Sequence, residues 1–205
     1  MTARPSEEKA GLTGWTIRAI AATLALAGLS RLWTDPAPLP AAPALVRNDT
    51  RIHLPATARP PLQGLAPGQV RSLLNIRERL TYGAFRWNED GVPAGPVLVR
   101  VDRKAQILSV FRGGHEIGTA VILYGAPEKP TPAGSYPVLG KAAYHRSRAY
   151  NADMPHTLWL TRDGVAIHGS RVREGAATHG CVGLPDAFAR KLFHEVKTGD
   201  PVVIV

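Results

Sequence analysis

The sequence of 205 residues contains a single cysteine, Cys181. With one thiol the chain cannot form an internal disulfide bond, so no cross-link of that kind stabilises the fold. Cys181 is therefore either a small apolar side chain buried in the core or a free, reactive thiol. Composition by itself favours the buried side chain, so a reactive role has to be argued from the residues around it.

The sequence also lacks any run of lysine and arginine, although its net charge is +9 and its pI is about 10.2. No pattern of aromatic residues suited to stacking on bases accompanies the basic ones. We therefore expect no nucleic-acid partner. The positive charge instead favours an anionic surface, such as acidic lipid or a charged cell-wall polymer.

A long apolar run is the third absence. The longest stretch, residues 19–29, is shorter than the roughly 20 residues that cross a bilayer, and it suits the apolar core of a secretory signal. Extended to residues 15–33 it almost reaches a spanning length, with tryptophans at both ends and Arg18 near one end. We predict that residues 1–33 are a signal peptide or a membrane anchor; a buried amphipathic helix is the weaker alternative. Both favoured alternatives export the protein to the periplasm or cell envelope, and the anchor would attach it to the inner membrane.

Proline separates this segment from the rest of the chain. Eight of the 18 prolines lie in residues 34–67, among many alanines, and this composition predicts an extended linker. The remaining residues, 68–205, are predicted to form one domain. Apolar residues at helical spacing predict a first helix at 69–82, which ends at Gly83.

From residue 96 onward, short β-rich segments alternate with turn residues. Three strands joined by hairpins are expected at 97–101, 107–111 and 117–124, and a fourth at 136–139 follows the rigid turn 129–134. Residues 141–155 are polar and irregular, which favours a long binding loop or lid. An Asp-Gly turn then joins strands at 157–161 and 165–168, and a helix from residue 185 to Gly199 precedes a last strand at 202–205. The predicted domain is mainly β, with a few short helices.

Residues 166–185 contain the only cysteine together with two histidines. A thiol of pKa about 8.5 is mostly protonated at neutral pH and needs a nearby imidazole as base. His168 ends a strand to which the following loop returns, so it is favoured as the base over the nearer His179. Gly180 would let the backbone turn before the nucleophile and direct amides at an oxyanion. A zinc site is less favoured, because one cysteine and two histidines supply three ligands at an unusual spacing.

Several motifs occur in one order along the chain. The series begins with V-R-V-D at 99–102, P-T-P-A-G at 130–134 and M-P at 154–155. It continues with I-H-G at 167–169 and T-H-G-C-V at 178–182, and it ends with G-D-P-V-V-I at 199–204. This set resembles the L,D-transpeptidase catalytic domain, the YkuD-like family, over residues 96–205. The resemblance implies a β-sandwich fold.

The same resemblance implies a cysteine acyltransferase that acts on the stem peptides of peptidoglycan. Cys181 would attack the carbonyl of the third stem residue and release the terminal D-alanine, and His168 would be the base. Gly169 matches a position whose backbone orients that imidazole, and Thr178, His179 and Gly180 match residues that shape the nucleophile turn and the oxyanion site. No metal or organic cofactor is implied.

Two departures from the family pattern stand beside the match. Gly183 occupies a position that is often arginine or asparagine, and the loop 169–177 is shorter than usual. Three functions therefore stay open: transfer of the acyl group to an amine, its transfer to water by an L,D-carboxypeptidase, and wall binding by a degenerate site. Retention of His168, Gly180 and Cys181 together argues against the degenerate site. The physiological acyl acceptor is not identified by the sequence.

Overall fold

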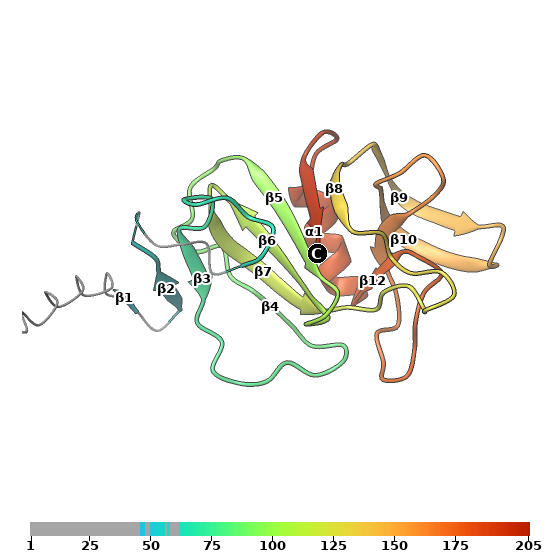
Figure 1. Cartoon of the computed structure of the whole chain (residues 1–205), viewed down its shortest axis with the longest axis horizontal. Coiled ribbons are helices and arrows are strands. Elements are labelled where there is room, and N and C mark those ends of the chain that lie inside the picture. The colour runs from blue at the N-terminus through green and yellow to red at the C-terminus, as the bar shows by residue number, and fades with distance from the viewer. Residues whose placement is uncertain (1–45, 48–49, 56, 58–61) are drawn as a thin grey trace, which may run out of the picture. The chain divides into compact units, whose positions relative to one another are not determined.

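The computed structural model describes residues 46–47, 50–55, 57 and 62–205 (Figure 1). The predicted signal peptide or anchor, residues 1–33, and the first part of the predicted linker lie outside these residues. Across the described part of the chain, no helix is both long and apolar enough to cross a membrane.

Within the described residues, the larger of two sheets has nine strands, most of them from the first half of the domain and one, β13, from its end. Its order is β1-β2-β3-β7-β6-β5-β13-β8, and β4 pairs with β7 beside this path. Its strands are β1 (Val46–Arg47), β2 (Arg51–His53), β3 (Ser72–Leu74), β4 (Phe85–Trp87), β5 (Val97–Asp102), β6 (Ile107–Arg112), β7 (His115–Val121), β8 (Gly134–Pro137) and β13 (Pro201–Ile204).

In the part of the chain that the structure describes, the smaller sheet has four strands in the order β12-β11-β10-β9. They are β9 (Gly140–Ser147), β10 (Ala152–Trp159), β11 (Ala166–Gly169) and β12 (Val182–Leu184). Neighbouring strands are antiparallel except β11 and β12, which are parallel. This single parallel pair lies where the sequence places its candidate site.

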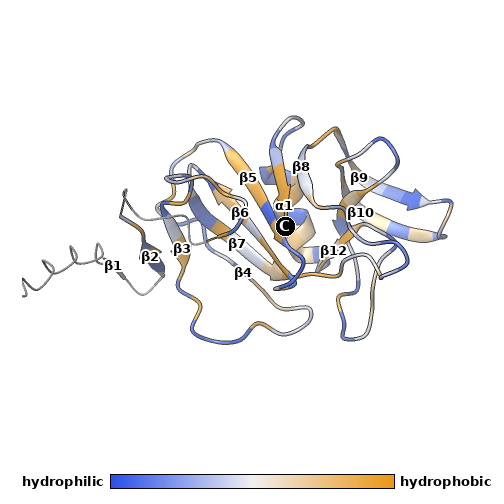
Figure 2. Cartoon of the chain, in the orientation of Figure 1, coloured by the Kyte–Doolittle hydropathy of each residue, from blue (hydrophilic) through white to orange (hydrophobic). Residues whose placement is uncertain are grey.

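One helix, α1 (Asp186–Glu195), links the two sheets (Figure 1). It packs against β10 and β11, and its buried Phe188 meets the rings of Phe85 and Trp87 on β4 edge to face. Burying such a side chain contributes about 1.5–3 kcal/mol. Figure 2 shows the apolar residues concentrated on central strands such as β5, between hydrophilic turns. The helix thereby fixes the small sheet, and the candidate site on it, against the large sheet.

Most of the expected strands are present. The hairpins formed by β5, β6 and β7 confirm the strands expected at 97–101, 107–111 and 117–124, although β7 begins two residues early, at His115. The Asp-Gly turn joins β10 to β11 as expected, and α1 and β13 follow. The prediction of a mainly β domain is confirmed, with one helix in the described residues.

The helix expected at 69–82 is wrong. Residues 72–74 form β3, and turns and irregular backbone follow up to β4. The reason is tertiary, because the backbone amide of Leu74 donates to the buried carboxylate of Glu116 at 2.9 Å and that of Arg71 donates to Gly114 O at 2.7 Å. Hydrogen-bond acceptors remote in sequence thus stabilise a strand here, although the spacing of the apolar residues favours a helix.

The long loop expected at 141–155 is also wrong, because these residues belong to the hairpin of β9 and β10. Most of β9 is exposed or half-buried, so its polar residues are compatible with a strand at the end of the sheet. The alternating pattern is hidden further by His156, which has a left-handed backbone (φ 55°) within β10. Sequence periodicity is therefore a poor guide to this hairpin.

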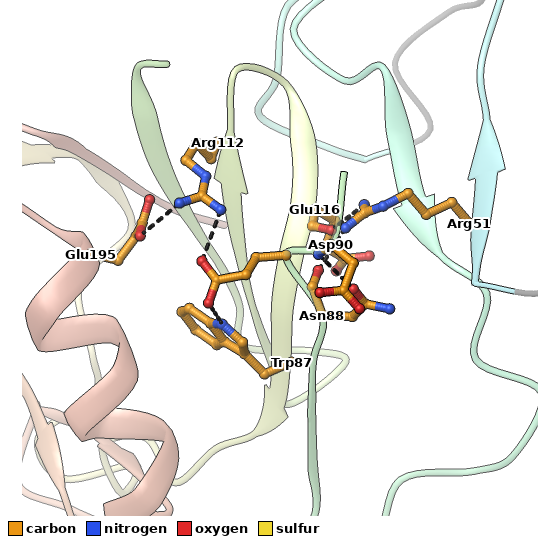
Figure 3. Close-up of polar contacts among 8 residues, drawn as sticks. Arg51, Trp87, Asn88, Asp90, Arg112, Glu116 and Glu195 are labelled. Carbon is orange, nitrogen blue, oxygen red and sulfur yellow. Dashed lines mark hydrogen bonds and ion pairs between the residues drawn. The ribbon is translucent and has the colours of Figure 1, made fainter. Parts of the chain in front are cut away.

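The range predicted as linker contributes β2, which pairs with β3. Arg51 on β2 is buried, and its guanidinium donates to the main-chain oxygens of Glu116 at 2.7 Å and Asn88 at 2.6 Å (Figure 3). Arg112 in the same view bridges Glu89 and Glu195, and so ties β6 to the end of α1. The boundary between linker and domain at 67/68 stays a prediction.

Candidate active site

The parallel pair of β11 and β12 brings the two ends of the suspected motif together. His168 pairs with Gly183 in register, two residues beyond Cys181, and Ile167 pairs with Val182. Cys181 directly precedes β12, so it lies at the end of the strand that pairs with the one carrying His168. The thiol donates to the main-chain oxygen of Gly164 at 3.7 Å, at the entrance to β11.

His168 is buried, and one ring nitrogen is held by the backbone. Its Nδ1 lies 2.7 Å from the main-chain oxygen of Gly169. Because a carbonyl oxygen only accepts hydrogen bonds, this contact assigns the proton to Nδ1 and leaves Nε2 of the neutral ring as an acceptor. A base for a thiol needs that tautomer.

Gly169 holds this arrangement because no side chain fits there. A Cβ at Gly169 would lie 2.6 Å from Oδ1 of Asp186 and 2.9 Å from Cγ of Pro155. Real Cβ atoms do not approach other atoms so closely. Glycine at this position therefore lets the start of α1 and β10 close on the backbone that anchors His168.

The turn before Cys181 is fixed by two threonines. Gly180 has a left-handed backbone (φ 103°), which glycine adopts without strain. The main-chain oxygen of Cys181 accepts from Oγ1 of Thr178 at 2.5 Å and from Oγ1 of Thr131 at 3.3 Å. Thr131 is buried, and its hydroxyl also accepts from the amide of Gly125 at 2.8 Å. Thr131 is not among the site residues predicted from the sequence, although its position between two prolines in a rigid turn is a usable signal.

His179 faces a different partner from His168. Its exposed ring stacks on Tyr150, at the tip of the β9–β10 hairpin, with centroids 4.2 Å apart and planes inclined by 12°. The Tyr150 hydroxyl accepts from Nζ of Lys129 at 2.9 Å. The structure thus connects His179 to the hairpin tip rather than to a position behind the thiol.

Cys181 opens onto a pocket of about 500 Å³. The pocket is bounded by the hairpin tip at 145–150, by the turn at 163–165, by Lys129 and by His179. His168 is not one of the described residues that line it. The pocket is large enough for a peptide segment that presents its carbonyl to the thiol.

The electrostatics favour a neutral pair at rest. Burial raises the pKa of the Cys181 thiol, which the backbone of Ala166 and the charge of Lys129 oppose. Burial also lowers the pKa of His168, which the Gly169 hydrogen bond and the Asp186 carboxylate oppose. At neutral pH the resting site therefore contains a protonated thiol and a neutral imidazole. A reaction at Cys181 then requires transfer of the thiol proton as the sulfur attacks.

No group of three or more histidine, cysteine, aspartate or glutamate side chains has a metal-binding arrangement in the part of the chain that the structure describes.

The fold and the site together define a β-rich domain with a candidate pair of one cysteine and one histidine. The histidine lies on β11, and the parallel neighbour of that strand, β12, begins directly after the cysteine. The chain belongs to the YkuD family of L,D-transpeptidase catalytic domains, because residues 96–204, more than half of its length, match the model of that family. The predicted family is confirmed.

Known proteins of this kind resemble the chain over part of their length. L,D-transpeptidase 1 of Mycobacterium tuberculosis is 28% identical over 134 residues, covering 57% of this chain and 53% of that protein. The chain thus spans about half the length of the curated relatives it matches. Among solved structures, an L,D-transpeptidase (Yku) from Stackebrandtia nassauensis has 24% identity, a TM-score of 0.51 and coverage of 57% and 59% of the two chains. One from Mycobacterium smegmatis has 25% identity and a TM-score of 0.49 over 53% and 58%. The Stackebrandtia structure supports the shared fold.

Proposed function

We propose that this protein is a peptidoglycan L,D-transpeptidase that uses Cys181 as nucleophile and His168 as base. The observation that carries the proposal is the parallel register of β11 and β12: Cys181 directly precedes β12, and β11 carries a histidine whose Nδ1 is already engaged. The pocket in front of Cys181 supplies room for a stem peptide.

The first half-reaction acylates the enzyme. Sγ of Cys181 forms a bond to the carbonyl carbon of the third stem residue, and the thiol proton passes to Nε2 of His168. The bond between that carbon and the nitrogen of the terminal D-alanine breaks, and the proton moves from Nε2 to the departing amine. The products are a thioester on Cys181 and free D-alanine.

The second half-reaction returns the enzyme to its starting state. An amine of the acceptor attacks the thioester carbonyl and gives a proton to Nε2 of His168, after which the carbon–sulfur bond breaks and the thiolate recovers the proton. We assign stabilisation of the oxyanion in both steps to the backbone amides at Gly180 and Cys181. The hydroxyls of Thr178 and Thr131 support this role, since they fix the carbonyl of Cys181 and hence the turn.

Mass spectrometry of the full chain incubated with a disaccharide tetrapeptide tests this assignment. The unaltered protein should gain the mass of the acyl group on Cys181, and Cys181→Ser should not. His168→Gln should acylate at least about a hundredfold more slowly, because general-base catalysis contributes that much or more. His194→Gln, which changes an exposed histidine on α1, is the matched control and should behave like the unaltered protein.

The products formed with and without an added amine acceptor distinguish the remaining alternatives. A cross-linked dimer supports the transpeptidase, whereas tripeptide alone, even with acceptor present, assigns the chain as an L,D-carboxypeptidase. Failure to form acyl-enzyme or product under either condition would contradict both enzymes and favour a wall-binding module. A carbapenem adduct mapped to Cys181 by mass spectrometry would be a faster first test of its reactivity.

We further propose that the protein works in the cell envelope, to which residues 1–33 direct it as a signal peptide or inner-membrane anchor. Its substrate in this proposal is found only there. Fractionation of cells that make the full chain or a chain without residues 1–33 tests this. The shortened chain should remain in the cytoplasm, and its export would contradict the proposal.

A further inference from the structure

One lysine next to the thiol has no role in the half-reactions described above. Lys129 precedes the turn that carries Thr131, and it lines the pocket in front of Cys181. Its Cγ and main-chain oxygen lie 3.8 Å from the position that a Cβ on Gly180 would take, so its stem passes beside the turn that orients the nucleophile. Burial raises the pKa of the Cys181 thiol, and the charge of the ammonium partly opposes that rise.

The ammonium of Lys129 is held in place without being neutralised. Its Nζ donates to the Tyr150 hydroxyl at 2.9 Å and lies 5.4 Å from the centre of the same ring. Tyr150 is in turn stacked on His179. A hydroxyl is an uncharged acceptor, so two of the three N–H donors and the full charge stay available to a ligand.

Two other cations line the pocket, Arg146 and Arg148, and no hydrogen bond to a described residue orients the guanidinium of Arg148. Arg146 is paired with the carboxylate of Asp153 and also donates to the side-chain oxygen of Asn151 at 2.8 Å. No ion pair of Lys129 occurs among the residues that the structure describes; the carboxylate of Asp163 interacts with it only through its field. Lys129 is therefore an oriented cation beside the nucleophile whose charge no adjacent carboxylate cancels.

We infer that Lys129 is a specificity-determining residue that binds the free carboxylate of the D-amino acid leaving the donor peptide. This inference rests on the proposed function, in which Cys181 attacks the carbonyl just before that residue. The leaving residue's carboxylate is only a few bonds from the attacked carbon, so it lies in the pocket next to the thiol. An ammonium anchored there binds donor peptides that end in a carboxylate more tightly. It disfavours donor peptides whose chain extends beyond this residue or ends in an amide.

Gly183 supports the same assignment. A Cβ at Gly183 would lie 3.1 Å from Cβ of Ser170 and 3.3 Å from Cβ of Leu123, so the backbone there is closely covered. The position two residues after Cys181 thus offers no side chain to a substrate. The negative charge of the donor peptide is instead recognised by Lys129, which lies in the segment 122–133 between β7 and β8.

Two donors that share one scissile bond test the inference. The first is the disaccharide tetrapeptide, and the second is the same molecule with its C-terminal carboxylate converted to an amide. Formation of the acyl-enzyme on the full chain is followed by mass spectrometry at low salt, and kcat/KM is compared between donors. The unaltered protein should prefer the carboxylate roughly tenfold, as expected for one charge-assisted hydrogen bond. Lys129→Met should abolish this preference by slowing the carboxylate donor alone.

Three further variants complete the test. Lys129→Arg should keep most of the preference, Lys129→Glu should reverse it, and Lys191→Met, which removes an exposed cation lying over Trp87, should leave it unchanged. Equal ratios in the unaltered protein and Lys129→Met, with both acylated at Cys181, would overturn the role of Lys129 and leave the proposed function standing. Absence of acylation of the unaltered protein by either donor would overturn both.

Discussion

Replacing Gly169 by alanine introduces one methyl group where three atoms already lie. The new Cβ would be 2.6 Å from Oδ1 of Asp186, 2.9 Å from Cγ of Pro155 and 3.3 Å from the main-chain oxygen of Pro155. The carboxylate can move, but the proline ring and its carbonyl are part of β10. The strain therefore has to be absorbed by a shift of the Gly169 backbone, which carries the carbonyl that binds Nδ1 of His168.

The magnitude follows from these contacts. Overpacking by one methyl group in a closed site costs about 1–3 kcal/mol. For a chain of this size, that lowers Tm by roughly 2–12 °C. A displaced Gly169 carbonyl also rotates the imidazole, and a misplacement of about 1 Å lowers a rate by up to about a hundredfold. We expect acylation of Cys181 to slow by about tenfold or more, beyond the fraction of protein that is unfolded.

Urea unfolding and the rate of acylation by a carbapenem measure the two effects on one preparation. Gly140→Ala is the matched control, because a Cβ there meets only Trp159, at an ordinary 3.7 Å. Alanine at such an unstrained site changes stability by less than about 1 kcal/mol, in the stabilising direction. The control should leave the acylation rate unchanged.

A double-mutant cycle identifies the contact responsible. Asp186→Ala removes the carboxylate oxygen nearest the new methyl group and by itself costs about 0.3–1 kcal/mol at the start of α1. The loss of stability in Gly169→Ala with Asp186→Ala should be smaller than the sum of the single losses by about 1 kcal/mol. Additive losses would assign the strain to Pro155 alone, and a Gly169→Ala protein as stable and active as Gly140→Ala would refute the packing argument.

Three further predictions concern ionisation and buried hydrogen bonds. Burial lowers the pKa of His168, so its neutral form persists below the ordinary value of about 6.5. The acid limb in the pH profile of kcat/KM for acylation of Cys181 should therefore lie below that pH. An acid limb above it would contradict the assignment of His168 as base. Thr131→Val should destabilise the protein by about 1–3 kcal/mol and slow acylation, while Thr198→Val, at an exposed position, should do neither in urea unfolding and rate measurements. Burial raises the pKa of Glu116, so the stability gained from its protonated form is present below about 4.5 and lost as pH rises through the raised value. The unfolding free energy of Glu116→Gln relative to the unaltered protein should therefore increase with pH, and a constant difference would count against this cause.

The part of the fold that could be predicted is the part decided locally. Alternating apolar residues and glycine turns suffice for β5, β6 and β7, and an Asp-Gly pair suffices for the turn between β10 and β11. The spacing at 69–82 fits a helix equally well on local grounds. The choice of β3 depends on Glu116 and Gly114, some forty residues away, and the periodicity of the segment does not contain that information.

The site divides in the same way. His168 stands in one short motif and Gly180 and Cys181 in a second one close by, so they could be selected from the sequence, although their chemical roles remain proposals. The contacts of Thr131 and Tyr150 depend on the connection before β8 and on the β9–β10 hairpin folding back over the motif. Such contacts join segments separated by long stretches of chain, and neither composition nor spacing predicts them.

Gly183 and the short loop after His168 are connected by the packing of β12. The backbone of Gly183 exchanges two hydrogen bonds with Leu123, each 2.9 Å long, while β11 pairs with its other side. The loop starts at Ser170, whose amide donates to Leu184 at 2.7 Å and whose Cβ would be 3.1 Å from a Cβ on Gly183. A larger residue at 183 would require Ser170 and Leu123 to move by a few tenths of an ångström. The glycine thus permits the tight approach of both neighbours to β12, including the first residue of the loop after His168.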